Sequence, residues 1–265
     1  MERSRTGSCA RAILRFLFAI AVLAPALAGA ASIPNVAAAS DLQFALTEIA
    51  AAFTRDTGGQ VKLVFGSSGN FRRQIAEGAP FELLLSADEE YVTALANEGR
   101  AEDSGVRYAT GRLVLFAATE SPLRPDAALA DLKAAVADGR IRHFAIANPE
   151  HAPYGRAARE ALQRAGLWDA LVPRLVLGEN VLQAAQFATV GGAQGGIIAY
   201  SLALSPVLAG KGTYAMLPAE SHAPLHQRMV LVKGAGPTAR EFYRYLQAPA
   251  ARSVFARFGF ALPGE

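Results

Sequence analysis

Cysteine is almost absent from this sequence of 265 residues, in which Cys9 is the only one. Everything after Cys9 therefore lacks the thiols needed for disulfide bonds, four-cysteine metal sites or a thiol nucleophile. A chain without such cross-links has to be held together by an ordinary hydrophobic core. The length after residue 31, about 230 residues, is enough for one large domain or two smaller lobes.

An excess of one charge is also missing from most of the chain. The 26 basic and 23 acidic residues give a formal net charge of +3. Four of the basic residues and one acidic residue lie in positions 2–15, so the remaining sequence carries 22 of each sign. Without a basic face, binding to nucleic acid loses its main electrostatic support and is not expected.

The early basic residues belong to a recognisable segment. They precede an uncharged apolar run at positions 16–28, which small residues follow at 28–32. This order predicts a cleaved export signal over residues 1–31 and hence an exported protein. A membrane anchor is the alternative, but Pro25 and the small residues argue against a stable span. A lipid anchor is not expected either, because Cys9 precedes the apolar run.

Short apolar strands alternate with polar turns and amphipathic helices through the rest of the chain. This alternation predicts an α/β fold in which mainly parallel sheets are flanked by helices. Two groups of these units predict two lobes with a ligand cleft between them, residues 32–111 with 236–265 in lobe 1 and residues 112–235 in lobe 2. The strands are expected at 34–39, 61–65, 83–86, 113–117, 143–147, 174–177, 196–199 and 229–233.

Four junctions between a predicted strand and the following helix resemble one another. In a parallel sheet such junctions lie at the carboxyl ends of the strands, where ligands bind. Each one also places a helix N-terminus there, with unpaired N–H groups and partial positive charge. Together they predict a small-anion site made without lysine, arginine or a metal. The junctions are Ala-Ser-Asp at 39–41, Gly-Ser-Ser-Gly at 66–69, Ala-Pro-Tyr-Gly at 152–155 and Glu-Asn-Val at 179–181.

Each junction alone has a simpler explanation. Ser40, Asp41, Ser68 and Asn180 are residue types that dominate the N-cap position of helices. The glycines could serve only the turns, and Tyr154 could be a surface aromatic residue. The binding hypothesis therefore depends on the four junctions occurring together.

Several motifs together resemble those of the periplasmic molybdate-binding components of ABC importers. They lie at 37–42, 65–69, 74–80, 86–88, 148–155, 178–181 and 258–260, and the resemblance covers residues 36–262. It implies the type II periplasmic binding protein fold, two lobes that close on their ligand around a hinge. It further implies molybdate or tungstate as the ligand and an ABC permease in the inner membrane as the partner. We expect a monomer that has no cofactor, no metal-cation site and no enzymatic activity.

The resemblance also implies which residues contact the oxyanion. Ser40 and Ser68 supply hydroxyl groups, while Asp41, Tyr154 and Val181 supply backbone N–H groups. Some members of the family use a tyrosine hydroxyl late in the second lobe. The corresponding position here is Ala199, with Tyr200 beside it, which leaves that contact in doubt.

Asp41 raises a difficulty, because its carboxylate would repel a dianion. One hypothesis turns the side chain away toward the N-terminus of its own helix, leaving only the N–H on the ligand. The other lets the carboxylate accept a proton from the ligand, which would favour protonated phosphate over molybdate.

Other functions have weaker support. The same fold could bind sulfate, phosphate or a small carboxylate, the last with Arg72 and Arg73 as a clamp. A serine hydrolase would need a Gly-x-Ser-x-Gly elbow, which 66–69 does not supply. The glycines at 191–196 lack the Lys-Ser/Thr of a phosphate-binding loop. Pro224 lies between His222 and His226 and prevents an ordinary helical metal pair.

Overall fold

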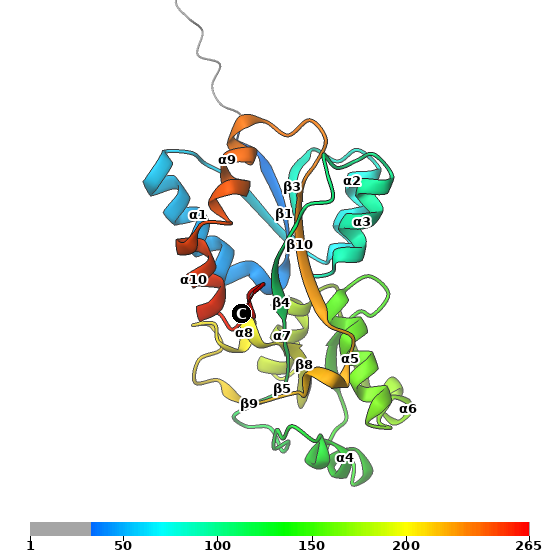
Figure 1. Ribbon diagram of the computed structural model, residues 1–265. Coiled ribbons are helices and arrows are strands. Elements are labelled where there is room, and N and C mark those ends of the chain that lie inside the picture. Colours follow the sequence, from blue (N-terminus) through cyan, green and yellow to red (C-terminus); the bar gives the residue numbers. More distant parts are fainter. Residues whose placement is uncertain (1–32, 265) are drawn as a thin grey trace, which may run out of the picture. The chain divides into compact units, whose positions relative to one another are not determined.

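Two separate five-stranded sheets organise the chain (Figure 1). The structure, a computed structural model, describes residues 33–264. The predicted export signal lies outside the described residues. No helix within 33–264 is both long and apolar enough to cross a membrane.

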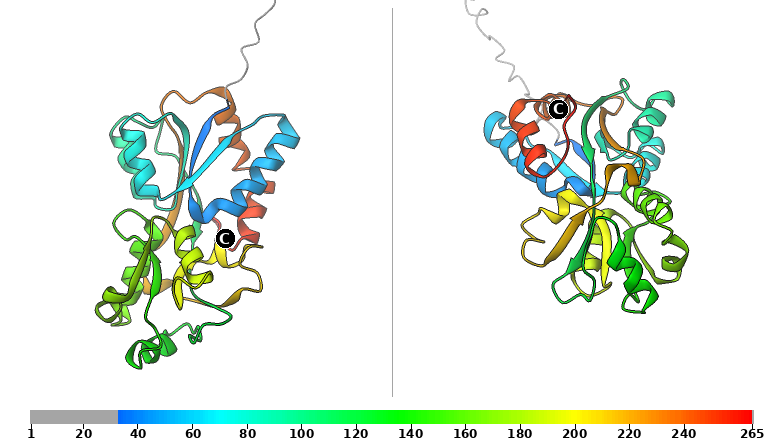
Figure 2. Two further views of the ribbon diagram at one scale, coloured as in Figure 1. Left: turned by 180° about the vertical axis from the view of Figure 1, so that it is seen from behind. Right: turned by 60° about the horizontal axis from the view of Figure 1, so that its bottom comes forward.

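The first sheet forms the core of lobe 1, with helices on both of its faces (Figure 2). Neighbouring residues of a strand point to opposite faces. Leu83 and Leu85 accordingly pack with α1, α9 and α10, whereas Leu84 packs with α2 and α3. The strand order is β2-β1-β3-β10-β4. The strands are β1 (Asn35–Ala39), β2 (Lys62–Gly66), β3 (Phe81–Ser86), β4 (Val106–Gly111) and β10 (Leu225–Leu231). The helices are η1 (Ser40–Leu42), α1 (Gln43–Thr57), α2 (Ser68–Ala76), α3 (Glu89–Asn97), α9 (Pro237–Tyr245) and α10 (Pro249–Arg257).

The second sheet forms lobe 2, in the order β7-β6-β8-β5-β9. Its strands pack with the surrounding helices in one hydrophobic cluster. The strands are β5 (Leu113–Ala118), β6 (Phe144–Ala147), β7 (Leu175–Gly178), β8 (Gly195–Ala199) and β9 (Gly212–Met216). The helices are α4 (Ala130–Ala137), α5 (Pro153–Arg164), α6 (Trp168–Leu171), η2 (Val172–Arg174), α7 (Val181–Thr189), α8 (Tyr200–Ala203) and η3 (Ala219–Ser221).

The predicted two-lobed α/β fold is confirmed, with corrections to its details. Each sheet is mixed instead of mainly parallel, because β10 runs antiparallel to β3 and β4, and β5 runs antiparallel to β8 and β9. The predicted lobe boundary at residue 235 is wrong, since β10 belongs to the first sheet. Strands β4 and β9 were not predicted. Apolar periodicity indicates that a strand exists, but neither its direction nor its partner.

The two sheets are joined by very little chain. Arg112 alone separates β4 from β5, and the return from β9 to β10 spans residues 217–224. In Figure 1, β4 runs directly toward β5 at the junction of the lobes. Backbone torsions at Arg112 and in residues 217–224 are therefore the places where one sheet can turn relative to the other.

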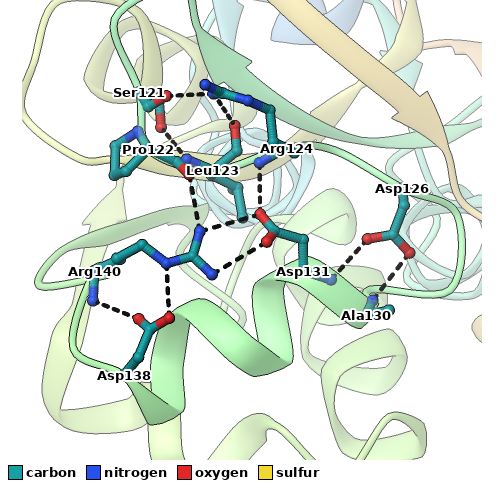
Figure 3. Close-up of polar contacts among 9 residues, drawn as sticks. All are labelled: Ser121, Pro122, Leu123, Arg124, Asp126, Ala130, Asp131, Asp138 and Arg140. Atoms are coloured by element: carbon teal, nitrogen blue, oxygen red, sulfur yellow. Dashed lines mark hydrogen bonds and ion pairs between the residues drawn. The ribbon is translucent and has the colours of Figure 1, made fainter.

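A polar cluster secures α4 in lobe 2 (Figure 3). The Arg140 guanidinium donates to Asp138 at 2.7 Å, to Asp131 at 3.1 Å and to the Pro122 carbonyl at 2.9 Å. The Asp126 carboxylate accepts from the first two N–H groups of α4, both at 2.9 Å. These carboxylates already have their donors, so the cluster is a structural support for the proline-rich segment before α4.

Candidate functional site

The four predicted junctions meet around one small cavity. Its empty volume is about 180 Å³, whereas three other hollows measure between about 920 and 990 Å³. Residues of both lobes line it, and as far as the structure describes the lining it contains no lysine, arginine or histidine. The lining residues are Ala39, Ser40, Asp41, Gly66, Ser67, Ser68, Ala87, Ala152, Pro153, Tyr154, Asn180 and Val181.

Ser40 and Ser68 line the cavity, and among the described residues neither hydroxyl donates a hydrogen bond. Both residues are buried. The Oγ atom of Ser40 accepts a hydrogen bond from the Leu182 N–H at 3.3 Å, and the Oγ atom of Ser68 accepts one from the Ala87 N–H at 2.9 Å. A hydroxyl that accepts through its lone pairs still has its proton to donate. Both serines can therefore donate to a ligand without losing the bonds that position them.

Helix N-termini supply the remaining donors. Tyr154 and Val181 occupy the second and first positions of α5 and α7. Amides at these positions have no carbonyl partner within their own helix. Asn180 caps α7, accepting from Leu182 and Gln183 at 3.1 Å each, so the N-cap interpretation is correct for Asn180. It is wrong for Ser40, Asp41 and Ser68, because Ala39 and Ser67 occupy the N-cap positions of η1 and α2.

Asp41 is buried, and donors from other elements hold its carboxylate. Its Oδ2 accepts from the Tyr154 hydroxyl at 3.0 Å and from the Gln227 Nε2 at 2.6 Å. Its Oδ1 has no hydrogen-bond partner among residues 33–264. The Ser201 hydroxyl donates to the Asp41 backbone carbonyl at 2.8 Å. The carboxylate thus turns mainly toward Tyr154 and Gln227, not chiefly toward its own helix N-terminus as one hypothesis expected.

Burial makes the Asp41 carboxyl group a weaker acid. Desolvation raises the pKa of Asp41 from 3.8 to about 6, although the hydrogen bonds from Gln227 and Tyr154 lower it in part. Desolvation also raises the pKa of Tyr108 and Tyr154, and the neighbouring Asp41 carboxylate adds to both shifts. Both phenols are therefore neutral near pH 7 and can act as hydrogen-bond donors.

Gln227 and Tyr108 are site residues that the sequence did not reveal. Gln227 is fully buried in β10, where its Nε2 donates to Asp41 and, at 3.2 Å, to the Tyr154 Oη. Its Oε1 accepts from the Tyr108 hydroxyl at 2.7 Å. A single glutamine in an apolar strand gives only a weak sequence signal, and its partners lie on three other elements.

A second set of contacts joins the lobes beside the cavity. The Ser67 Oγ lies 2.9 Å from the His151 Nδ1, and the Gly69 N–H donates to the His151 carbonyl at 3.0 Å. Arg156 of α5 forms an ion pair with Asp88, which caps α3. The sequence placed His151 in a motif but gave it no role.

Other candidate residues lie elsewhere. Arg72 pairs with Glu98 and Arg73 donates to Asn70 at 3.1 Å; neither lines the cavity, so the carboxylate clamp is not formed. Tyr200 packs against the Tyr214 ring, with 5.7 Å between the ring centroids, and is not among the lining residues. No cluster of three or more histidine, cysteine, aspartate or glutamate side chains suited to a metal ion occurs in the described part of the chain.

Comparisons with known proteins agree with this architecture. The family model for bacterial extracellular solute-binding proteins matches residues 34–261. The molybdate-binding protein ModA of Rhodobacter capsulatus is 39% identical over 244 residues, covering 90% of this chain and 92% of the relative. The protein of the same name from Escherichia coli strain K12 is 34% identical over 257 residues, covering 93% and 97%. The solved periplasmic molybdate-binding protein of Azotobacter vinelandii matches with a TM-score of 0.79 at 31% identity, covering 87% of this chain and 99% of that one.

Proposed function

The chain belongs to the family of bacterial extracellular solute-binding proteins, and from this premise we propose that it binds molybdate and delivers it to an ABC permease. The observation that carries the proposal is the small interlobe cavity with hydroxyl and amide donors from both lobes. This cavity is far smaller than the three other hollows, so it suits an anion of a few atoms and not a peptide or sugar chain.

The donor set suits a fully deprotonated oxyanion. Ser40 and Ser68 each have a hydroxyl proton to give, and helix N-termini provide amides with partial positive charge. Molybdate and tungstate are unprotonated dianions at neutral pH, so they accept from every direction. We therefore propose Ser40, Asp41, Ser68, Tyr154 and Val181 as the ligand contacts, with Asp41, Tyr154 and Val181 acting through their backbone N–H groups.

Selection by size follows from where the donors are anchored. Ser40 and Ser68 belong to lobe 1, whereas Tyr154 and Val181 belong to lobe 2. The cavity reaches its final dimensions only when the lobes meet, so an anion that is too small leaves some donors unpaired. This arrangement favours molybdate and tungstate over the smaller sulfate and phosphate.

Binding is coupled to transport through the shape of the protein. An anion held by both lobes stabilises the conformation in which they meet, because it has fewer contacts when they are apart. We propose that the permease in the inner membrane recognises this closed form. The proposal includes export by the signal at residues 1–31, a monomeric state, and a function that needs neither catalysis nor a cofactor.

Isothermal titration calorimetry with molybdate, tungstate, sulfate and phosphate tests the function. We expect dissociation constants in the micromolar range or below for molybdate and tungstate, and affinities roughly 100-fold or more weaker for the other two. Micromolar binding of phosphate without binding of molybdate would overturn the assignment.

One observation favours phosphate as a second candidate ligand. The Oδ1 of Asp41 is buried without a partner in the described chain, and such an oxygen could accept the proton of monohydrogen phosphate. The same titrations separate the two candidates, since only the second predicts that phosphate binds more tightly than molybdate.

A further inference from the structure

Asp41 is the one acidic residue among those that line the cavity. Its two oxygens differ sharply in their surroundings. Oδ2 accepts two hydrogen bonds, whereas Oδ1 is buried and accepts none from the described residues. A buried oxygen without a partner costs free energy unless a proton or a ligand satisfies it.

We propose that binding of a dianion in this cavity takes up one proton from solvent at Oδ1 of Asp41, and that the resulting O–H group donates to the oxyanion. This inference rests on the proposed function and deepens it. The step forms one O–H bond at Oδ1 and breaks none in the protein, because the proton comes from the buffer. Asp41 then contributes a side-chain donor as well as its backbone N–H.

The surrounding hydrogen bonds direct the proton to Oδ1. The Tyr108 hydroxyl donates to the Oε1 of Gln227 at 2.7 Å, which leaves the Nε2 of Gln227 facing Asp41 at 2.6 Å. The Tyr154 hydroxyl occupies a second position on Oδ2 at 3.0 Å. A proton on Oδ2 would point at these two donors and break their hydrogen bonds, so protonation costs least at Oδ1.

Electrostatics favour the neutral acid once the dianion is present. Asp41 already has a raised pKa through burial. A negative ligand in the same enclosed space raises it further, since like charges at short range disfavour ionisation. The pKa of the complex therefore lies above that of the free protein, and binding near neutral pH is accompanied by proton uptake.

Other ionisable groups near Asp41 do not offset this effect. Tyr108 and Tyr154 are neutral, and Arg156 and Arg228 are paired with Asp88 and Glu89. Helix α7 carries no ionisable residue, and α8 carries only Tyr200. Five further titratable residues lie on helices or strands that pack against η1, or beside Gln227, the partner of Asp41. Four of them are exposed, namely Glu48, Arg55 and Asp56 on α1 and Lys62 on β2, and the fifth, His226 on β10, is half-buried.

Calorimetry can measure the number of protons that the protein takes up when it binds the anion. Molybdate is titrated into the protein at pH 7.5 in two buffers of different ionisation enthalpy, and the difference in observed enthalpy gives the number of protons taken up. We expect about one. Across pH 6.5–8.5, where molybdate stays a monomeric dianion, the dissociation constant should rise with pH by up to about tenfold per unit.

Asp41→Asn provides the matched variant. The asparagine Oδ1 can accept from Tyr154 and Gln227, while its Nδ2 supplies a permanent donor in place of the protonated oxygen. We expect proton uptake near zero, an affinity independent of pH, and tighter binding than the wild type at pH 8.5. Asp138→Asn, at a surface carboxylate paired with Arg140, should leave uptake and pH dependence unchanged.

The outcomes distinguish this inference from the proposed function. Normal molybdate binding without proton uptake in the wild-type protein would overturn the inference and leave the function standing. Failure to bind molybdate at any pH would overturn the function itself. The wild-type titrations decide the inference even if the asparagine variant folds poorly.

Discussion

The hydroxyl group of Tyr154 in lobe 2 donates a hydrogen bond of 3.0 Å to the carboxylate of Asp41 in lobe 1, and both side chains are buried. The junctions at 39–41 and 152–155 are therefore joined by a hydrogen bond between their side chains, and both also line the cavity. This bond gives the Tyr154 hydroxyl a structural role in joining the lobes, separate from the ligand contact that we propose for its backbone N–H.

Tyr154→Phe should affect stability more than binding. The substitution removes the hydroxyl that donates to Asp41 and accepts from Gln227, but keeps the backbone N–H. We expect the free energy of unfolding to fall by about 1–3 kcal/mol, the cost of leaving buried polar partners unpaired. Urea denaturation gives the stability and calorimetry the affinity.

Tyr245→Phe is the matched control. Tyr245 also donates to an aspartate, Asp56 at 2.6 Å, but on the exposed surface. Its loss should cost less than about 0.5 kcal/mol, because water replaces the missing partner. Equal losses in the two variants would contradict the structural role assigned to the buried bond.

Ser40→Ala and Ser68→Ala should each weaken oxyanion binding. Each variant removes a hydroxyl proton aimed at a charged ligand, which costs roughly 1.5–3 kcal/mol, or about 10- to 150-fold in affinity. Ser253→Ala serves as the control, since Ser253 is on the exposed face of α10 and its hydroxyl donates to the Pro249 carbonyl of the same helix. Losses below about threefold in both site variants would place the ligand elsewhere.

Gly69→Ala should prevent the lobes from meeting. A Cβ at this position would lie 2.6 Å from the His151 carbonyl oxygen, a backbone atom of the other lobe. Gly69 does not have a positive φ, and alanine is a better helix former than glycine. Within lobe 1 the new Cβ would approach the Tyr91 hydroxyl at 3.0 Å, but this is the end of a side chain that can shift, so lobe 1 itself should tolerate the change. We expect a rise of about tenfold or more in the dissociation constant, since closure contributes to binding.

Small-angle X-ray scattering provides a second measurement for Gly69→Ala. Molybdate should reduce the radius of gyration of the wild type and of Asn70→Ala, the next residue of α2, but not of Gly69→Ala. Full ligand-induced compaction of Gly69→Ala would show that the lobes close without this close approach.

Asp41 should also leave a signature in the pH dependence of stability. Its pKa rises from 3.8 in the unfolded chain to about 6 in the folded protein. The folded state therefore binds this proton more tightly, so the contribution of Asp41 favours folding at low pH and is lost as the pH rises through about 6. Relative to the wild type, Asp41→Asn should gain about 2 kcal/mol of stability between pH 4.5 and 7.5. Urea denaturation of both proteins at the two pH values measures this difference, and a constant difference would contradict it.

The sequence was sufficient to predict the four junctions, because their residue types mark the start of helices after buried strands. Their convergence in two pairs followed from a general property of parallel strands, whose carboxyl ends share one edge of a sheet. The two pairs then meet because the two sheets face one another across the cavity. Ser40, Ser68, Tyr154 and Val181 all line the cavity, although their contact with a ligand stays a prediction.

The residues that the sequence did not reveal depend on long-range pairing. Tyr108 and Gln227 are 119 positions apart and meet only because β10 lies between β3 and β4. Strand patterns in one sequence do not specify such a neighbour. Because strand partners could not be predicted, the lobe boundary was also wrong: β10 was assigned to lobe 2, which precedes it in the chain, although it pairs in the sheet of lobe 1.

The position of β10 also determines the order in which the chain can fold. Strand β4 is at the edge of its sheet, where β10 is its neighbouring strand and Thr110 also forms a bridge with Ala261 near the end of the chain. A ribosome completes β4 at residue 111 but does not begin β10 until residue 225. Lobe 2 can assemble in that interval, while lobe 1 remains without a strand in the interior of its sheet and without α9 and α10. The core of lobe 1 is therefore completed only after the last segments of the chain have been made, so lobe 2 can fold before lobe 1 does.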